Sequence, residues 1–397
     1  MKRKILSLLS IFAVLLILNS QKSTLVEATN EDTNNTIQLL EDAKSGILIE
    51  RNTGRILYEQ NAHVKRSPAS MTKIMSMLLV TDAIESGKLK WDDIITVSAH
   101  ASSYGGSQVY LAENEKISVE DLYKGMVIAS GNDATVAFAE AVAGSEELFV
   151  QMMNERAQEL GLKNTVFKDP TGLTSYSDGH YSTAYDMAML SRTLLHEHQD
   201  IVLKYTQIYE DYLREGTDRE FWLVNTNRLV RHVEGLDGLK TGWTRESGYN
   251  LTATMNKNDM RLISVIMGNS TPTKRSSETM KMLNYGYTIF EVKEFKPNNH
   301  RVGVYKSVYL DPGKVDIITK EPIYFVVKKG EKLDGYLESF DYDFKGDHYE
   351  TGDVIGKYQV LKNGEIVYEV DLTVSQDVSR IGFFGLFSKT IKKTFFG

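Results

Sequence analysis

The chain has 397 residues, of which 42% are hydrophobic and 25% are charged. This composition excludes a disordered or fibrous protein, and at roughly 150 residues per domain the length predicts two or three packed domains. No cysteine is present, which excludes a disulfide framework, thiolate metal sites and a cysteine nucleophile. The net charge of −7 argues weakly against a phosphate backbone as a partner, so we expect no nucleic acid.

The first 28 residues have the pattern of a secretory signal. A basic start precedes a nearly continuous apolar stretch at 5–18, and Ala28 closes a small-x-Ala pattern. The apolar stretch would rise about 21 Å as a helix, less than the roughly 30 Å of a membrane core. We therefore predict a signal peptide at 1–28 that is cleaved, rather than an uncleaved anchor, and an exported protein.

The first part of the mature chain mixes strand and helix patterns. A β-hairpin is predicted at 46–60. The next helix has Ser67 as its N-cap, Pro68 at its first position and Gly87 at its end. Further helical patterns lie at 118–129, 132–143, 146–160, 182–196 and 274–291, and strand patterns at 249–255 and 261–268. These elements predict an α+β domain at 29–295, with an antiparallel sheet built from both of its ends.

A polar break at 295–299 separates a region of short strands. Strands are predicted at 302–309 and 323–327, with a hairpin of 357–361 and 365–370 around Asn363 and Gly364. We predict a small all-β domain at 298–375.

The pattern of the last segment, 376–397, predicts an amphipathic helix. At 100° per residue its apolar side chains project to one side and its lysines to the other; they are Phe383, Phe384, Phe387, Ile391 and Phe395, and Lys389, Lys392 and Lys393. The segment is too short and too charged to span a membrane. We expect it to lie on the outer face of the cytoplasmic membrane, attracted by anionic lipid. The alternative is a tail packed on the β domain.

Three short motifs follow one another in the predicted α+β domain. They are Ser70-Met71-Thr72-Lys73, Ser130-Gly131-Asn132 and Lys240-Thr241-Gly242. Each motif alone is weak, because a chance match in a chain of this length is unsurprising and each also fits a helix start, a cap or a turn. Their order and the elements that carry them give the set its weight.

Ser70 and Lys73 stand three residues apart on one helix, so their side chains can meet. A serine hydroxyl needs a base to become a nucleophile, and a lysine is a base only when burial and nearby positive charge lower its pKa. Lys240 is the candidate for that charge. The other two motifs add hydroxyl, amide and cationic groups beside a glycine that a substrate strand can approach. Together they offer a nucleophile, a base, a proton relay and a carboxylate clamp.

Other catalytic patterns are not met. The chain has no Gly-x-Ser-x-Gly elbow and no Walker loop. His196-Glu197-His198 does not have the spacing of a His-Glu-x-x-His zinc site, and we interpret it as a solvated helix end. We expect no metal and no cofactor.

The three motifs and the segments around them resemble the low-molecular-mass penicillin-binding proteins that are serine D-alanyl-D-alanine carboxypeptidases. Beyond the motifs, the segments that carry the resemblance are 129–134, 160–165, 235–242, 247–249 and 261–264. The resemblance covers nearly the whole chain. It implies a β-lactamase/transpeptidase-like domain with helices and an antiparallel sheet, then a small all-β domain and the C-terminal anchor.

In that family the serine is acylated by the D-Ala-D-Ala end of a peptidoglycan stem peptide, the last D-Ala leaves, and water frees the enzyme. The resemblance implies that Ser70 is the nucleophile, Lys73 the base and Ser130 the relay of the proton to the leaving amine. β-Lactams are the expected inhibitors.

The resemblance also implies the substrate contacts. Asn132 would bind the peptide amide, Lys240 and Thr241 of the third motif, which ends in Gly242, would bind the terminal carboxylate, and the backbone N–H groups of Ser70 and Trp243 would form the oxyanion hole. Arg275 is a weaker candidate for the carboxylate. Trp243 replaces a residue that is often smaller or more polar.

Two alternatives stay open from the sequence. A β-lactamase of class A uses a glutamate to activate water, and the segment from Glu159 to Asn164 is one residue out of the usual register. Such enzymes also lack a β domain. A non-catalytic sensor of peptidoglycan or β-lactam would not need the set of Ser70, Lys73 and Ser130 that is intact here.

Overall fold

The computed structural model describes residues 37–382 and 385–387. The predicted signal peptide at 1–28 therefore lies outside the described residues, as do 383–384 and 388–397 of the predicted helix at 376–397. The start of that predicted helix is wrong, because Val378–Arg380 form strand β19, which pairs with two other strands of the β domain. Among the residues that are described, no helix is long and apolar enough to cross a membrane.

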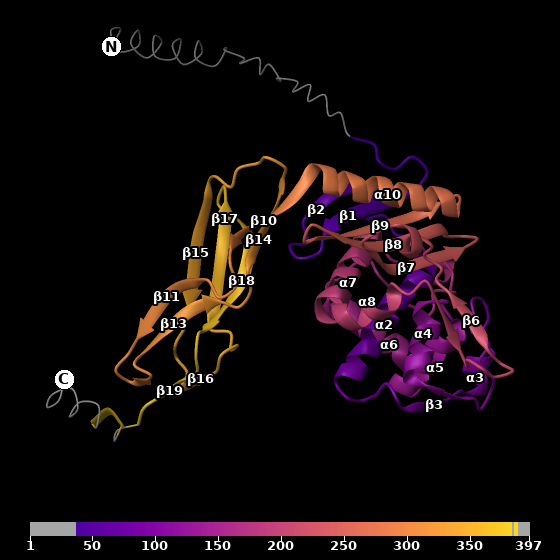
Figure 1. Ribbon diagram of the computed structural model, residues 1–397, viewed down its shortest axis with the longest axis horizontal. Coiled ribbons are helices and arrows are strands. Elements are labelled where there is room, and N and C mark those ends of the chain that lie inside the picture. Colours follow the sequence, from indigo (N-terminus) through magenta and orange to yellow (C-terminus); the bar gives the residue numbers. More distant parts are fainter. Residues whose placement is uncertain (1–36, 383–384, 388–397) are drawn as a thin grey trace, which may run out of the picture. The chain divides into compact units, whose positions relative to one another are not determined.

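The first domain is built on a five-stranded antiparallel sheet with the order β2-β1-β9-β8-β7 (Figure 1). Its strands are β1 (Ser45–Glu50), β2 (Ile56–Gln60), β7 (Leu236–Thr244), β8 (Gly248–Lys257) and β9 (Met260–Asn269). β1 pairs with β9, so that Leu48 lies opposite Ser264. The prediction of an antiparallel sheet from both ends of the domain is confirmed.

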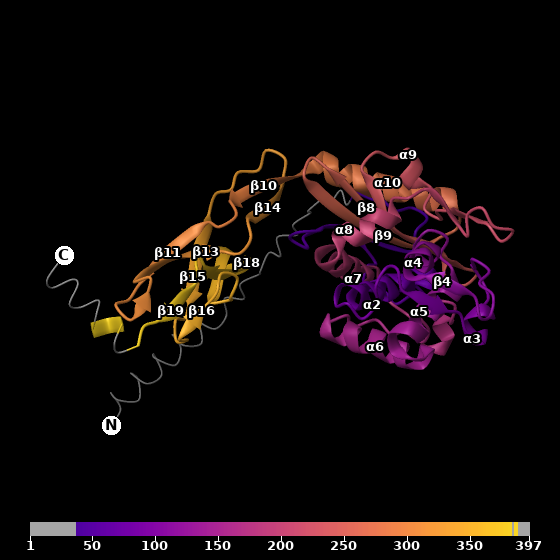
Figure 2. The same ribbon diagram turned by 60° about the horizontal axis from the view of Figure 1, so that its bottom comes forward.

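Helices cover both faces of this sheet, as Figures 1 and 2 show from two directions. Helix α10 (Pro272–Ile289) packs on one face. The other face carries α2 (Lys73–Glu85), α4 (Val119–Val127), α5 (Asn132–Ala143), α6 (Glu146–Glu159), α7 (Ala184–Glu197) and α8 (Gln199–Thr206). Eleven of the 13 residues of helix α2 are buried, in keeping with its largely apolar sequence. The lysine at its start is therefore taken out of water.

Short elements complete the domain. They are the 3₁₀ turns η1 (Ala69–Thr72) and η2 (Tyr176–Asp178), the helices α3 (Ala99–Ser102) and α9 (Leu229–His232), and the strand pairs β3 (Ile94–Thr96) with β4 (Lys116–Ser118) and β5 (Glu210–Leu213) with β6 (Phe221–Val224). The sequence patterns did not predict the two strand pairs.

The start of the predicted helix at Ser67 and Pro68 needs a correction. Residues 69–72 form the 3₁₀ turn η1, and the α-helix begins only at Lys73. Ala69 has a φ of 49°, in the left-handed region, so the chain cannot be α-helical there. Ser70 consequently lies on a 3₁₀ turn and not in the first turn of the α-helix.

The C-terminal part is all β. Its strands are β10 (Phe290–Lys296), β11 (Arg301–Lys306), β12 (Leu310–Asp311), β13 (Lys314–Thr319), β14 (Ile323–Lys328), β15 (Tyr336–Tyr342), β16 (His348–Tyr349), β17 (Gly356–Lys362), β18 (Glu365–Val374) and β19 (Val378–Arg380). Three sheets have the orders β11-β13-β18-β17-β15, β12-β19-β16 and β10-β14. The predicted hairpin is confirmed: Asn363 and Gly364 both have positive φ, as a two-residue turn of type I′ requires.

Candidate active site

The three motifs meet at one cavity of about 310 Å³. Its lining residues are Ser70, Ser107, Ser130, Thr226, Thr241, Gly242, Trp243, Tyr249 and Arg275. Six of the nine residues predicted for the site line this cavity. The other three, Lys73, Asn132 and Lys240, are buried. Thr226 and Ser107 were not predicted, because none of the three motifs contains them. Tyr249 lies in the segment 247–249 that carries the resemblance, but it was not predicted as a site residue.

Lys73 lies at the first position of α2 and points toward Ser70. Its Nζ atom is 3.3 Å from Ser70 Oγ and donates to Asn132 Oδ1 at 2.6 Å and to the Thr171 carbonyl at 3.0 Å. The amide of Asn132 is oriented by its Nδ2, which donates to the Gly105 carbonyl at 2.7 Å. Two of the three partners of Nζ can therefore only accept hydrogen bonds.

A neutral lysine amine has two N–H groups and one lone pair. Asn132 and the Thr171 carbonyl use the two N–H groups, so the lone pair is left for the Ser70 hydroxyl. Burial lowers the pKa of Lys73 to about 7, although the charges of Asp169 and Asp133 act in the opposite direction. The amine is thus neutral in a large fraction of molecules near pH 7 and is arranged to accept a proton.

The cause of this lowered pKa differs from the sequence-based expectation. We expected the charge of Lys240 to assist burial, but burial is the cause that acts on Lys73. The charge of Lys73 instead affects Lys240. Burial lowers the pKa of Lys240 well below its usual range, and the charges of Lys73 and Arg275 lower it further.

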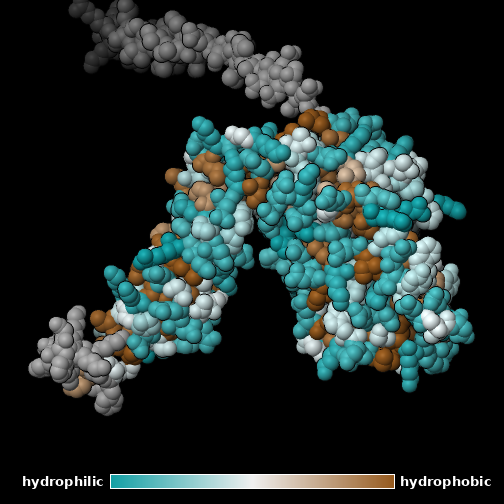
Figure 3. Space-filling view, in the orientation of Figure 1, coloured by the Kyte–Doolittle hydropathy of each residue, from teal (hydrophilic) through white to brown (hydrophobic). Residues whose placement is uncertain are grey.

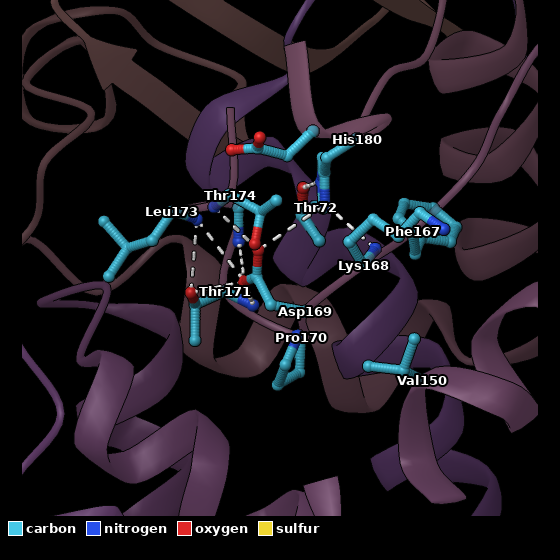
Figure 4. A network of polar contacts seen from close by, with 12 residues as sticks. Thr72, Val150, Phe167, Lys168, Asp169, Pro170, Thr171, Leu173, Thr174 and His180 are labelled. Atoms are coloured by element: carbon cyan, nitrogen blue, oxygen red, sulfur yellow. Dashed lines mark hydrogen bonds and ion pairs between the residues drawn. The ribbon is translucent and has the colours of Figure 1, made fainter. Parts of the chain in front are cut away.

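The loop at 169–174 places the carbonyl that binds Lys73 (Figure 4). Asp169 accepts hydrogen bonds from the backbone N–H groups of Thr171, Gly172 and Thr174 at 2.7, 2.6 and 2.8 Å. Gly172 has a φ of 85°, and a Cβ there would lie 1.9 Å from the Ala69 carbonyl oxygen. The loop therefore packs directly on the turn that carries Ser70, which requires glycine at 172.

His180 holds the same turn from inside. Its Nδ1 accepts the Lys168 N–H at 3.1 Å, which leaves Nε2 to donate to Thr72 Oγ1 at 2.8 Å. Burial lowers the pKa of His180, in keeping with this neutral tautomer. Figure 4 shows His180 beside Thr72 and Asp169. The sequence analysis did not identify Asp169 or His180 as parts of the site.

Ser130 is positioned by a strained backbone. Its φ is 62°, and its buried Oγ has no hydrogen-bond partner among the described residues. A buried hydroxyl without a partner is costly, so its persistence at a cavity wall is typical of a group that bonds to a ligand.

The third motif lies inside β7, at the edge of the sheet. A Cβ on Gly242 would lie 2.5 Å from the Pro68 carbonyl oxygen and 3.2 Å from the Ser70 nitrogen, so glycine is required for β7 to run this close to η1. Thr241 Oγ1 donates to Thr226 Oγ1 at 2.6 Å, and Lys240 Nζ donates to the Thr241 carbonyl at 3.2 Å.

Arg275 reaches the same cavity from the first turn of α10. It is buried, and its Nε has no partner among the described residues. With Lys240 it places two basic side chains beside the cavity. Such a pair favours an anionic group in the cavity.

Comparison with known proteins identifies this arrangement. The sequence profile of Peptidase S11, D-alanyl-D-alanine carboxypeptidase, matches residues 3–271. The chain belongs to this family. The profile of the penicillin-binding protein 5 C-terminal domain matches residues 290–380. The chain is accordingly a serine-type D-alanyl-D-alanine carboxypeptidase with the all-β domain of this family.

Individual carboxypeptidases of the family agree. The chain is 44% identical to D-alanyl-D-alanine carboxypeptidase DacF of Bacillus subtilis over 91% of this chain and 92% of that protein. It is similar to the crystal structure of penicillin-binding protein 5 from Haemophilus influenzae, with a TM-score of 0.70 and 31% identity over 85% of this chain and 98% of the other. Penicillin-binding protein D2 from Listeria monocytogenes, solved with cefotaxime bound, is 32% identical over 62% of this chain and 97% of the other, with a TM-score of 0.56.

Glu159, the residue considered above as the water-activating glutamate of a class A β-lactamase, does not lie in the site. Glu159, at the end of α6, is 65% exposed at its side chain and pairs with Arg156 at 3.2 Å. It does not line the cavity.

The interpretation of His196-Glu197-His198 as a solvated helix end is wrong for His198. This residue is buried between α7 and α8, and its ring contacts Asp82 at 2.6 Å and Glu85 at 2.9 Å, both on α2. Among the described residues, one cluster has the side chains and spacing that could hold a metal ion. It consists of Asp82, Glu197 and His198, whose ligand atoms lie within 4.8 Å of one another. Carboxylates already occupy both nitrogens of the ring.

Proposed function

We propose that this chain removes the terminal D-Ala from peptidoglycan stem pentapeptides through an acyl-enzyme on Ser70. The observation that carries this proposal is the position of Lys73 Nζ, 3.3 Å from Ser70 Oγ with its other partners both acceptors. A neutral amine in this position takes the hydroxyl proton as Ser70 attacks the carbonyl carbon of the penultimate D-Ala.

The remaining groups divide the reaction between them. The substrate carboxylate binds beside Lys240, Thr241 and Arg275, whose basic groups and hydroxyl suit an anion. The Thr241 hydroxyl, which donates to Thr226 Oγ1 in the free site, turns to donate to the carboxylate. The backbone N–H groups of Ser70 and Trp243 stabilise the oxyanion, and Ser130 passes a proton to the amine of the departing D-Ala. Water then attacks the ester and returns the Ser70 hydroxyl.

Asn132 has a second role beyond the substrate contact that the resemblance implies. Both ends of its amide are already engaged, Oδ1 with Lys73 and Nδ2 with the Gly105 carbonyl. An amide oxygen has two lone pairs, so the substrate amide N–H would bind the second lone pair of Oδ1. Asn132 then orients the base and the substrate with one atom.

β-Lactams acylate Ser70 in this proposal, because their amide mimics the D-Ala-D-Ala bond. The similarity to penicillin-binding protein D2, which was solved with cefotaxime bound, supports this. We also propose a signal peptide at 1–28, a catalytic domain predicted at 29–295, a β domain predicted at 298–375 and a membrane-binding segment at 376–397. The strands β10 and β19 extend the β domain beyond its predicted bounds, so the part of 376–397 that binds the membrane follows β19. The mature enzyme would work outside the cell, peripheral on the outer face of the cytoplasmic membrane.

The test is a reaction of the mature protein with a stem peptide ending in D-Ala-D-Ala. We expect one D-Ala to be released per peptide without cross-linked product. Ser70→Ala should release none and should not be labelled by fluorescent penicillin, while its thermal unfolding stays that of the parent. Covalent labelling of the folded variant would refute the assignment of Ser70.

A further inference from the structure

A loop of the β domain exposes two neighbouring apolar side chains. Val308 and Tyr309, between β11 and β12, are 64% and 52% exposed. Val354, in the turn that follows β16, is also exposed. Figure 3 shows apolar residues in brown on the lower part of this domain. Isolated exposed apolar residues are ordinary, whereas adjacent ones at a loop tip call for an explanation.

The backbone of this loop is well defined by hydrogen bonds. Ser307 Oγ accepts from the Tyr309 N–H at 3.2 Å, the Ser307 carbonyl accepts from the Leu310 N–H at 3.3 Å, and the Ser307 N–H donates to the Gly313 carbonyl at 3.0 Å. These bonds fix the turn without burying either apolar side chain. Exposure of Val308 and Tyr309 is therefore a property of the folded loop.

The loop lies where the chain leaves the β domain. The Ile381 N–H donates to the Tyr309 carbonyl at 2.8 Å, and Arg380 of β19 pairs with Leu310 of β12. Strand β19 is the central strand of the sheet β12-β19-β16. The segment that we propose to bind the membrane thus continues from a residue hydrogen-bonded to Tyr309.

Two lysines stand at the base of the loop, where they suit contact with an anionic surface. Lys306 and Lys314 are exposed and lie opposite each other on β11 and β13. Between them, Asp311 is the acidic residue of the loop sequence. Tyrosine is enriched at membrane interfaces because its ring is apolar and its hydroxyl is polar, and basic residues are drawn to anionic headgroups.

We propose that the loop at 307–310 is a second membrane contact, with Val308 among the upper acyl carbons and Tyr309 at the headgroups. This inference rests on the proposed membrane binding by 376–397. The loop would supplement that segment and fix the end of the β domain against the lipid, so that the domain could not rotate freely about its tail.

The absence of cysteine allows a direct test with single-cysteine variants of the mature chain. Val308→Cys and the control Leu337→Cys carry an environment-sensitive fluorophore; Leu337 is 68% exposed in the same domain. On vesicles of phosphatidylglycerol and phosphatidylcholine, we expect a blue shift and increased emission at 308 but not at 337. Equal spectra at the two positions with bound protein would overturn the inference.

Partitioning onto the same vesicles gives the second test. Val308→Ser with Tyr309→Ser should bind about tenfold more weakly than the parent, since each lost apolar contact weakens partitioning. The control pair, Leu337→Ser with Ile366→Ser, removes similar exposed groups and should bind as the parent does.

The outcomes separate the two proposals. If the parent binds vesicles and both double variants bind equally well, the loop contact is wrong while membrane binding by 376–397 stands. If the parent does not bind, the membrane proposal fails and the loop inference fails with it. If the fluorophore at position 308 shows the blue shift without lipid, and the shift grows with protein concentration, the loop contacts a second copy of the chain. That result also overturns the inference. Release of D-Ala from a soluble peptide should be the same in all variants.

Discussion

The Nζ atom of Lys73 lies 2.6 Å from Oδ1 of Asn132 and joins the start of α2 to the start of α5. Each residue comes from a different motif, so the short contact links the base to the Ser-x-Asn loop. Because Oδ1 of Asn132 is an uncharged acceptor, it holds the amine without placing a negative charge beside it. This relationship leads to the first two predictions.

Acylation should depend on the protonation of Lys73. Burial lowers the pKa of Lys73 to about 7, and only the neutral amine accepts the Ser70 proton. The rate of acylation by fluorescent penicillin should therefore rise with pH, with its midpoint near 7, when measured from pH 5 to 9. Lys73→Arg, which stays charged, should lose the reaction at every pH. A rate that is flat between pH 6 and 8 would contradict Lys73 as the base.

Asn132→Asp should move this pH dependence to higher pH. The substitution places a carboxylate 2.6 Å from Nζ, and a close opposite charge raises the pKa of a lysine by about 1–3 units. The pH at which the acylation rate reaches half its maximum should rise with this pKa. Asn132→Ala is the control, because it removes the hydrogen bond without adding charge and should slow acylation without an alkaline shift. The same shift in both variants would show that charge is not the cause.

Thr241→Val should weaken substrate binding more than it slows the chemical step. The valine loses one hydrogen bond to the substrate carboxylate, and a bond to a charged group contributes about 1.5–3 kcal/mol. KM for D-Ala release should rise about tenfold or more, with a smaller change in kcat. Lys73→Ala should instead lose acylation while substrate binding is retained. Equal defects in the two variants would argue against this division of roles.

Asp169→Asn should destabilise the fold by about 2 kcal/mol and slow acylation, since the amide cannot accept all the N–H groups of the loop. Burial opposes ionisation of Asp169, but the hydrogen bonds from Thr171 and Thr174 outweigh it and lower the pKa. The carboxylate therefore stabilises the fold above pH 4, and this contribution is lost as the pH falls.

Denaturant unfolding at pH 7 and pH 3 measures this effect. The difference between parent and Asp169→Asn should be largest at pH 7 and should narrow at pH 3. Asp178→Asn, at the exposed end of the neighbouring 3₁₀ turn η2, is the matched control and should change the free energy of unfolding little. If the free energies of unfolding of parent and Asp169→Asn differ by the same amount at both pH values, the charge of the carboxylate is not the cause of the stabilisation.

His198→Gln should cost more stability in acid than in alkali. Burial opposes protonation of His198, but hydrogen bonds and charges from Asp82 and Glu85 outweigh it and raise the pKa. The contribution is complete below the pKa of the unfolded chain, about 6.5, and disappears as the pH rises through the higher folded value. We expect a loss of about 2 kcal/mol at pH 5.5 and a smaller one at pH 9, measured by denaturant unfolding. His63→Gln, at an exposed position, is the matched control and should change the free energy of unfolding little.

Most of the long helices of the first domain, the hairpins at 46–60 and 357–370, and the three motifs could be predicted from the sequence by itself. Alternation, helical spacing and the Asn363-Gly364 turn are local properties, because they depend on residues a few positions apart. The i, i+3 spacing of Ser70 and Lys73 was sufficient to predict that their side chains meet, even though a 3₁₀ turn, and not an α-helix, carries Ser70.

The chemical state of the site was decided only by the tertiary structure. The carbonyl that binds Lys73 belongs to Thr171, and the cation beside Lys240 belongs to Arg275, both far away in the sequence. His198 shows the same limit, since a local pattern placed it in water and packing against α2 buried it. Desolvation is the reason: a side chain loses water to whatever segments fold around it, so its pKa depends on neighbours that no local spacing specifies.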